Sequence, residues 1–125
     1  MAELNSLDPN AVPAATNYLG GEPEMIILDS SHEYSATGRE LDLWYLALKM
    51  GGIFVVHDVS QFASGFDVTG QGGVQRAFAE WRQKNPQAEA ISLNGESRSM
   101  ELPRPLYKDA CGVGLIHKPE VSTVA

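Results

Sequence analysis

The segment from residue 25 to residue 60 constrains the fold more strongly than any other part of the chain. Two short apolar runs, at residues 25–28 and 53–56, enclose a stretch that ends at the pair Gly51-Gly52. Runs of this kind are typical of strands that are covered on both faces, as in a parallel sheet. Between them, from about residue 36 to residue 50, apolar side chains recur at helical spacing. The order of strand, helix and strand predicts an α/β fold.

Polar side chains follow each predicted strand directly. Asp29 and His32 follow the first strand, and His57 and Asp58 follow the second. In open α/β sheets, ligands bind at the carboxyl ends of the strands. We therefore expect these four side chains to meet in one crevice and to form a functional site.

The remaining segments continue the α/β pattern. We divide the single predicted domain into an N-terminal loop with a short helix at 9–19 (1–23), the strand-helix-strand unit (24–60), a loop (61–73), and a helix with two last strands at 90–94 and 112–117 (74–125). Thr37 and Glu40 have the spacing of a capping box at the start of the second helix. The loop at 61–73 is either a substrate loop or an ordinary connection.

Composition narrows the range of partners. The chain has 125 residues, which is at most one domain, and its net charge is −7 without a cluster of Lys or Arg. Nucleic acid and anionic membranes are therefore poor candidates as partners. No apolar run is long enough to span a bilayer. The single cysteine, Cys111, excludes an internal disulfide. We expect a cytoplasmic protein.

The first predicted strand, at residues 25–28, has no obvious neighbour on its outer side. An apolar strand that is left as an open edge favours association with other chains. We expect it to be covered by a missing N-terminal half of the domain, by a second copy of the chain, or by residues 1–23.

Four sequence motifs carry a resemblance to a known family. They are LDSSHEY (28–34), KMGGIFVVHDVS (49–60), GGVQRAFAEW (72–81) and GVGLIHK (112–118). Together they resemble the C-terminal half of class I S-adenosylmethionine-dependent methyltransferases. The branch they resemble most is that of the small-molecule O-methyltransferases, which includes cephalosporin hydroxylase-like and macrolide sugar enzymes. The resemblance implies a Rossmann-like sheet of parallel strands with a final antiparallel hairpin strand.

The resemblance also implies a metal-assisted reaction. It implies S-adenosylmethionine as the cofactor, a small hydroxylated molecule as the substrate, and a divalent metal, with Mg²⁺ favoured. Asp29, His57 and Asp58 fall at the positions of the family's metal ligands. His57 departs from the pattern, because the family commonly has Asp there and imidazole suits Zn, Ni or Fe better than Mg. Orienting the substrate or accepting a proton is therefore an open alternative for His57.

The remaining site residues follow from the same resemblance. His32 lies near the position of a catalytic lysine in catechol-type enzymes, and we expect it to accept the proton of the acceptor hydroxyl. Ser6 and Leu7 match a loop that lies beside the adenine of the cofactor. Ser30 and Ser31 either contact the adenine or cap the following helix.

Three hypotheses follow. No glycine-rich turn after an apolar strand precedes residue 25, so the chain resembles a half-domain that lacks most of the cofactor pocket. The first hypothesis is an O-methyltransferase represented by its C-terminal half. The alternative is a non-catalytic remnant or interaction module that dimerises through its exposed first strand. A receiver-like or flavodoxin-like module is a third reading, but the acidic pair and late lysine of receiver domains are not found.

Overall fold

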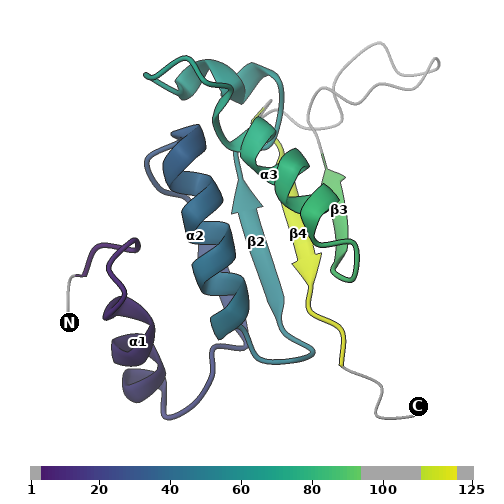
Figure 1. The fold of residues 1–125 in the computed structure, drawn as a ribbon. Coiled ribbons are helices and arrows are strands. Elements are labelled where there is room, and N and C mark those ends of the chain that lie inside the picture. The colour runs from purple at the N-terminus through teal and green to yellow at the C-terminus, as the bar shows by residue number, and fades with distance from the viewer. Residues whose placement is uncertain (1–3, 94–110, 121–125) are drawn as a thin grey trace.

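The computed structural model describes residues 4–93 and 111–120. In chain order the elements are α1 (Ala11–Leu19), β1 (Met25–Leu28), α2 (Tyr34–Ala47), β2 (Ile53–His57), the 3-10 helix η1 (Phe62–Phe66), α3 (Gly73–Lys84), β3 (Glu89–Leu93) and β4 (Val113–His117). α2 and α3 lie side by side on one face of the sheet, and α1 lies beside α2 (Figure 1).

The four strands form one sheet in the order β1-β2-β4-β3. β1 and β2 are parallel, and β4 runs antiparallel to both of its neighbours, β2 and β3. The predicted α/β fold, with parallel strands and a final antiparallel strand, is confirmed. The two last strands lie within one residue of their predicted starts, whereas residue 94 and the connection at 95–109 lie outside the described residues.

The hydrophobic core lies between the sheet and the two helices. Phe54 and Ile116 are paired in register on β2 and β4, and both are fully buried. Leu41 of α2 and Trp81 of α3 belong to the same cluster. The rings of Tyr45 and Trp81 meet edge to face at 4.9 Å between centroids, which joins the two helices across the core.

The opposite face of the sheet is apolar but exposed. Ile27 of β1, Val55 of β2, Leu115 of β4 and Ile91 of β3 form one continuous row across the four strands. Ile27 is 67% exposed and Ile91 is 54% exposed. The expectation that the first two strands are covered on both faces is therefore wrong for the described residues, in which helices cover one face only.

The starts of two helices differ from their predictions. α1 begins after Asn10, and α2 begins after Glu33, and neither cap makes a side-chain hydrogen bond. The capping box at Thr37 and Glu40 is wrong, because Thr37 already lies inside α2 and donates its backbone N–H to Glu33. Glu40 is buried and has other partners, described below.

The C-terminal end of α2 is fixed by Lys118, which directly follows the last strand, β4. Lys118 Nζ donates to the carbonyl oxygens of Tyr45, Leu46 and Leu48, at 3.0, 3.3 and 2.7 Å. A cation at this position neutralises the partial negative charge of the helix C-terminus. Gly51 then turns the chain into β2 at a φ of 82°, a conformation that favours glycine.

None of the helices in the described ranges is both long and apolar enough to cross a bilayer.

Candidate metal and cofactor site

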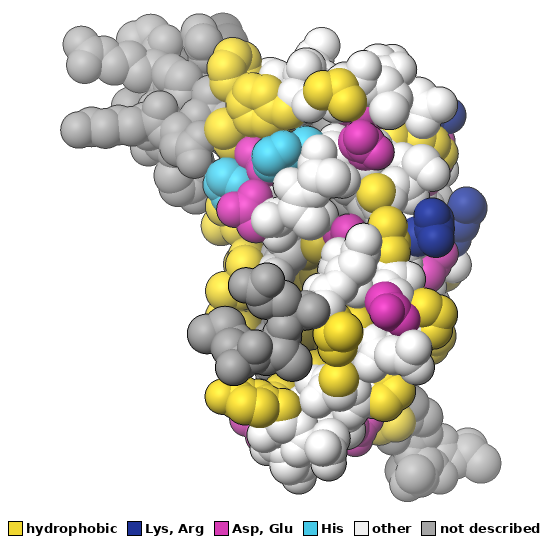
Figure 2. Space-filling model, turned by 90° about the vertical axis from the view of Figure 1, so that its left-hand side faces the viewer, with side chains coloured by type: hydrophobic (Ala, Val, Ile, Leu, Met, Phe, Trp, Pro, Cys, Tyr) yellow, Lys and Arg dark blue, Asp and Glu magenta, His cyan; other side chains and the backbone are white. Residues whose placement is uncertain are grey.

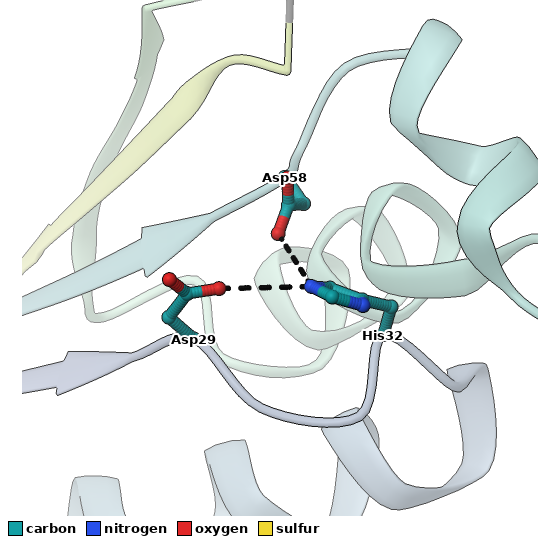
Figure 3. Close-up of side chains that lie close together, drawn as sticks. All are labelled: Asp29, His32 and Asp58. Atoms are coloured by element: carbon teal, nitrogen blue, oxygen red, sulfur yellow. Dashed lines mark ion pairs between the residues drawn. The ribbon is translucent and has the colours of Figure 1, made fainter.

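Three side chains from the ends of neighbouring strands converge on one point (Figure 3). Asp29 follows β1, Asp58 follows β2, and His32 lies on the connection between β1 and α2. His32 Nε2 is 3.0 Å from Asp58 Oδ2 and 3.6 Å from Asp29 Oδ1. One ligand atom from each of the three residues lies within 4.8 Å of the others, a spacing that can hold a metal ion. The sequence predicted that these residues would meet, and they do.

The site is open on one side and closed on the other. The Asp29 side chain is 57% exposed and that of His32 is 35% exposed, whereas that of Asp58 is only 4% exposed. The backbone N–H of Asp58 donates to the carbonyl oxygen of Gly112, which ties the inner carboxylate to the start of β4. A ligand can therefore approach from the Asp29 side while Asp58 holds a fixed position.

Two of the three residues have a strained backbone. His32 has a φ of 66° and Asp58 has a φ of 67°. The left-handed region is uncommon for residues other than glycine, and such residues cost on the order of 1–3 kcal/mol each. They are the only non-glycine residues with positive φ in the described part of the chain, and both point their side chains into the same cluster (Figure 3).

His57 lies at the edge of this group. Its Nδ1 is 3.1 Å from Asp58 Oδ1 and 3.8 Å from Asp29 Oδ1. The two imidazoles thus approach different oxygens of the Asp58 carboxylate. The structure places His57 beside the predicted ligands, but the three-residue group with mutual ligand spacing contains His32 in its place.

Glu40 connects two of the predicted cofactor residues. Ser6 Oγ donates to Glu40 Oε1 at 2.9 Å, and Ser30 Oγ donates to Glu40 Oε2 at 2.6 Å. Glu40 is 2% exposed, so each oxygen of a buried carboxylate has a partner. The N-terminal segment and the loop after β1 are therefore joined through one side chain of α2.

The sequence analysis missed this role of Glu40. The available signal was its position: Glu40 directly precedes Leu41 and lies one turn before Trp44, on the side of α2 that faces the protein. Trp44 Nε1 donates to the carbonyl oxygen of Ser6 at 2.9 Å, which adds a second tie to the same segment.

The other two predicted cofactor residues have local contacts. The backbone N–H of Leu7 donates to Asn5 Oδ1 at 2.9 Å. Ser31 Oγ accepts the backbone N–H of Glu33 at 3.5 Å, although the helix cap is Glu33 and not a serine. Ser30 and Ser31 therefore do not cap α2 in the manner expected for an N-cap residue.

Asp67 is a second important carboxylate that the sequence analysis missed. It accepts the backbone N–H of Tyr34 at 3.0 Å and that of Gly73 at 2.9 Å, and so joins the starts of α2 and α3. It also accepts the hydroxyl and the backbone N–H of Thr69. The Thr69 hydroxyl, followed by the three backbone donors, holds the pKa of Asp67 well below its ordinary value, although burial opposes this shift.

Comparisons with solved structures show that the fold of this chain occurs in known proteins. No family model matches the chain, and no curated protein matches it in sequence. Cofactor-bound Rv0187 from MTB is similar in structure, with a TM-score of 0.59 at 14% identity over 90% of this chain and 46% of that one. The MycE methyltransferase from the mycinamycin biosynthetic pathway, in complex with Mg, SAH and mycinamycin VI, has a TM-score of 0.57 at 15% identity.

These matches cover nearly all of this chain but less than half of each solved protein. The MycE complex with mycinamycin VI is matched over 98% of this chain but 34% of its own length. A second MycE complex, with Mg and SAH, has a TM-score of 0.56 and is matched over 95% of this chain and 32% of its own length. The chain thus spans less than half the length of the solved proteins that it matches. It shares its fold with part of these solved structures, among them the MycE methyltransferase.

Proposed function

We propose that the chain is the C-terminal half of an S-adenosylmethionine-dependent O-methyltransferase that uses a divalent metal and methylates a small hydroxylated molecule. The observation that carries the proposal is the cluster of Asp29, His32 and Asp58 at the carboxyl ends of two parallel strands of a methyltransferase fold. The presence of Mg and SAH in the MycE complexes supports the choice of cofactor and metal.

The donor atoms fit a divalent cation. Asp29 and Asp58 offer carboxylate oxygens, which hard cations such as Mg²⁺ prefer. The third ligand in this proposal is an imidazole, either from His32, which has the required spacing, or from His57, at the position implied by the family resemblance. An imidazole ligand would widen the range of acceptable metals toward Zn or Fe.

The two histidines allow a division of roles. Methyl transfer forms a bond between the acceptor oxygen and the methyl carbon, breaks the bond between that carbon and sulfur, and releases the hydroxyl proton. A divalent cation, when bound, would lower the pKa of that hydroxyl and fix its orientation. The histidine that is not a ligand accepts the proton, with His32 as our first choice because it lies near the position of the catalytic lysine in the catechol-type enzymes that the chain resembles. The imidazolium that forms then releases the proton to solvent and regenerates the neutral base.

Cofactor binding would involve Ser6, Leu7, Ser30 and Ser31. The hydroxyl hydrogens of Ser6 and Ser30 are directed to Glu40. These two serines can therefore offer the cofactor a lone pair but not a hydrogen. Backbone groups of the same loops would supply any donors that the adenine requires.

The test is a calorimetric titration of S-adenosylmethionine into the 125-residue chain, with and without Mg²⁺. Saturable binding that Mg²⁺ strengthens would support the proposal and would justify assays on hydroxylated acceptors. A folded chain that binds neither ligand would contradict the proposal for this chain by itself.

The second candidate is a non-catalytic module that pairs with a second copy or with a separate N-terminal half. The observation in its favour is the exposed edge and face of β1, where Met25 is 60% exposed and Ile27 is 67% exposed. Sedimentation of the chain would separate the two candidates, since dimerisation without cofactor binding favours the module. A monomer that binds S-adenosylmethionine favours the enzyme.

A further inference from the structure

The connection between β1 and α2, residues 29–33 (the site loop), carries Asp29 and His32 of the candidate metal site. Figure 2 shows histidine side chains beside acidic side chains at the surface of the molecule. The Asp29 side chain is 57% exposed, and its Oδ1 lies 3.6 Å from His32 Nε2 and 3.8 Å from His57 Nδ1. These distances are too long for hydrogen bonds. The two imidazoles therefore do not hold Asp29 in place.

The site loop also contains a residue with a strained backbone. His32 has a φ of 66°, and such a conformation persists only where the surrounding structure enforces it. At the far end of the loop, Asp67 accepts the backbone N–H of Tyr34 at 3.0 Å and so fixes the start of α2. A second fixed point is needed nearer to Asp29, at the start of the loop.

Glu40 provides this fixed point through Ser30, the residue directly after Asp29. Ser30 Oγ donates to Glu40 Oε2 at 2.6 Å, the length of a charge-assisted hydrogen bond between a hydroxyl and a carboxylate. Within the same loop, Ser31 Oγ accepts the backbone N–H of Glu33 at 3.5 Å. The Ser30 hydrogen bond is therefore the shorter of the two, and it ties the loop to a different element, α2.

The carboxylate of Glu40 is itself held in place. Glu40 is 2% exposed and lies within α2 next to Leu41, which is fully buried. Its other oxygen, Oε1, accepts the hydroxyl of Ser6 at 2.9 Å. Because Ser6 holds one oxygen, the rotation of the carboxylate is fixed and Oε2 faces Ser30. Glu40 is therefore a buried anchor for an exposed loop.

We propose that Glu40 is a positioning residue for the site loop. Through the hydroxyl of Ser30 it fixes the backbone that carries Asp29 and His32, and so keeps their ligand atoms at metal-binding distance. The inference rests on the proposed function, because it gives Glu40 a part in that same metal site. Glu40 acts through Ser30 and is not itself a ligand, in the way that residues behind metal ligands orient them.

The test measures the binding of Mg²⁺ alone, without cofactor, by NMR titration of the His32 imidazole in the 125-residue chain. The variants are Ser30→Ala, Glu40→Ala and Glu40→Gln. Trp44→Phe is the matched control, because it removes the indole N–H that donates to the carbonyl oxygen of Ser6, a tie of α2 to the N-terminal segment and not to the site loop. Urea unfolding identifies the variants that are folded under the conditions of the titration.

We expect Mg²⁺ to bind about tenfold more weakly to Ser30→Ala and to Glu40→Ala, the lower end of the range seen when partners of metal ligands are removed. Ser30→Ala decides the test by itself if Glu40→Ala does not fold. Glu40→Gln should have an affinity closer to that of the wild type, because its amide can accept from one serine hydroxyl and donate to the other. Trp44→Phe should bind Mg²⁺ as the wild type does.

NMR relaxation of the backbone amides of the site loop, measured without Mg²⁺, separates this inference from the proposed function. Ser30→Ala should lower the order of the loop, and Trp44→Phe should not. If the wild type binds no Mg²⁺ but the loop loses order in Ser30→Ala, the metal-assisted reaction is wrong and the positioning role stands. If the wild type and Ser30→Ala bind Mg²⁺ equally well, the positioning role is wrong and the metal site stands.

Two further results would overturn the positioning role of Glu40. One is a site loop whose order is the same in the wild type and in Ser30→Ala. The other is an equal loss of Mg²⁺ affinity in Ser30→Ala and Trp44→Phe, which would show that any lost hydrogen bond of this region weakens the site.

Discussion

At the scale of single residues, the carboxylate of Asp58 lies between two imidazoles. Its Oδ1 is 3.1 Å from His57 Nδ1, and its Oδ2 is 3.0 Å from His32 Nε2. The side chain is 4% exposed, so its position is set by the protein and not by solvent. Any cation at this site would meet a carboxylate that is already oriented.

Asp58→Asn tests the role of that carboxylate. Asparagine has nearly the same shape and accepts a positive φ readily, so the fold should persist while the negative charge is lost. We expect the affinity for Mg²⁺ to fall by at least ~10–100-fold, the range seen when residues that merely support metal ligands are removed. Asp42→Asn, on the exposed surface of α2, is the control and should bind Mg²⁺ as the wild type does. Equal affinity in the two variants would remove Asp58 from the ligand set.

Glu40 is predicted to stabilise the protein through its two serine partners. In Glu40→Ala, the hydroxyls of Ser6 and Ser30 lose a charged acceptor, so the free energy of unfolding should fall by about 2 kcal/mol. Glu40→Gln keeps one acceptor oxygen and should lose less. Urea unfolding measures both, with the exposed Glu22→Ala as the control. A loss in Glu40→Ala no larger than that in Glu22→Ala would show that the serines find other acceptors.

Sequence reasoning located the strand-end residues but not the buried carboxylates. Asp29 and Asp58 were predictable because an apolar run marks where each strand ends. Glu40 was not, since one of its partners, Ser6, lies 34 residues away and is brought near only by tertiary packing. For Asp67 only the hydrogen bond from Tyr34, 33 residues away, depends on tertiary packing. Its contacts with Thr69 and Gly73 are local, so part of its role could have been predicted.

At the scale of elements, Asp67 ties two helix starts and one loop together. Its pKa lies well below its ordinary value of 3.8 in the folded protein, chiefly because the Thr69 hydroxyl donates to it. A carboxyl group with a lowered pKa stabilises the fold above its ordinary pKa, and this contribution is lost as the pH falls. Acid should therefore loosen the junction of α2, α3 and η1.

We expect the melting temperature of the wild type to fall steeply below about pH 4, where unfolded Asp67 becomes protonated. Asp67→Asn should melt lower than the wild type at pH 7, and the difference should narrow as the pH falls. Thr69→Val, which removes the strongest donor, should give an intermediate curve. Calorimetric scans between pH 3 and pH 7 provide the measurement. Curves that stay parallel over this range would mean that Asp67 does not cause the acid sensitivity.

The order and type of the elements were predictable from the sequence, but which faces of the strands are buried was not. Helical spacing and apolar runs identified α2, α3 and all four strands. The apolar runs at 25–28 and 53–56 predicted burial on both faces, although Met25 and Ile27 are more than half exposed. An apolar run indicates that the side chains of a strand are kept away from water. The protein layer that covers these side chains need not belong to the described residues.

At the scale of the whole molecule, the open face of the sheet is the largest unexplained feature. The row from Ile27 to Ile91 crosses all four strands and is matched by no described helix. Contiguous exposed apolar surface of this kind marks an interaction site or an aggregation hazard. Together with the open edge of β1, it indicates a surface that is prepared for a further layer of protein.

Ile27→Lys tests whether that surface causes association. A charge at the β1 end of the apolar row should disfavour contact between chains, so the variant should sediment as a monomer at concentrations at which the wild type associates. Leu46→Lys is the control, since Leu46 is 76% exposed on α2, on the opposite side of the sheet. Association that is unchanged in Ile27→Lys and lost in Leu46→Lys would place the contact on the helical side.

The strained conformations of His32 and Asp58 have a consequence for how the sequence can vary. Glycine at either position would relieve the positive φ and make the free protein more stable. The same replacement would remove the imidazole or the carboxylate from the site. Random variants selected for heat resistance alone should therefore accumulate glycine at positions 32 and 58, whereas variants selected for turnover should retain the strain. Evolution toward stability and evolution toward activity act in opposite directions at these two positions.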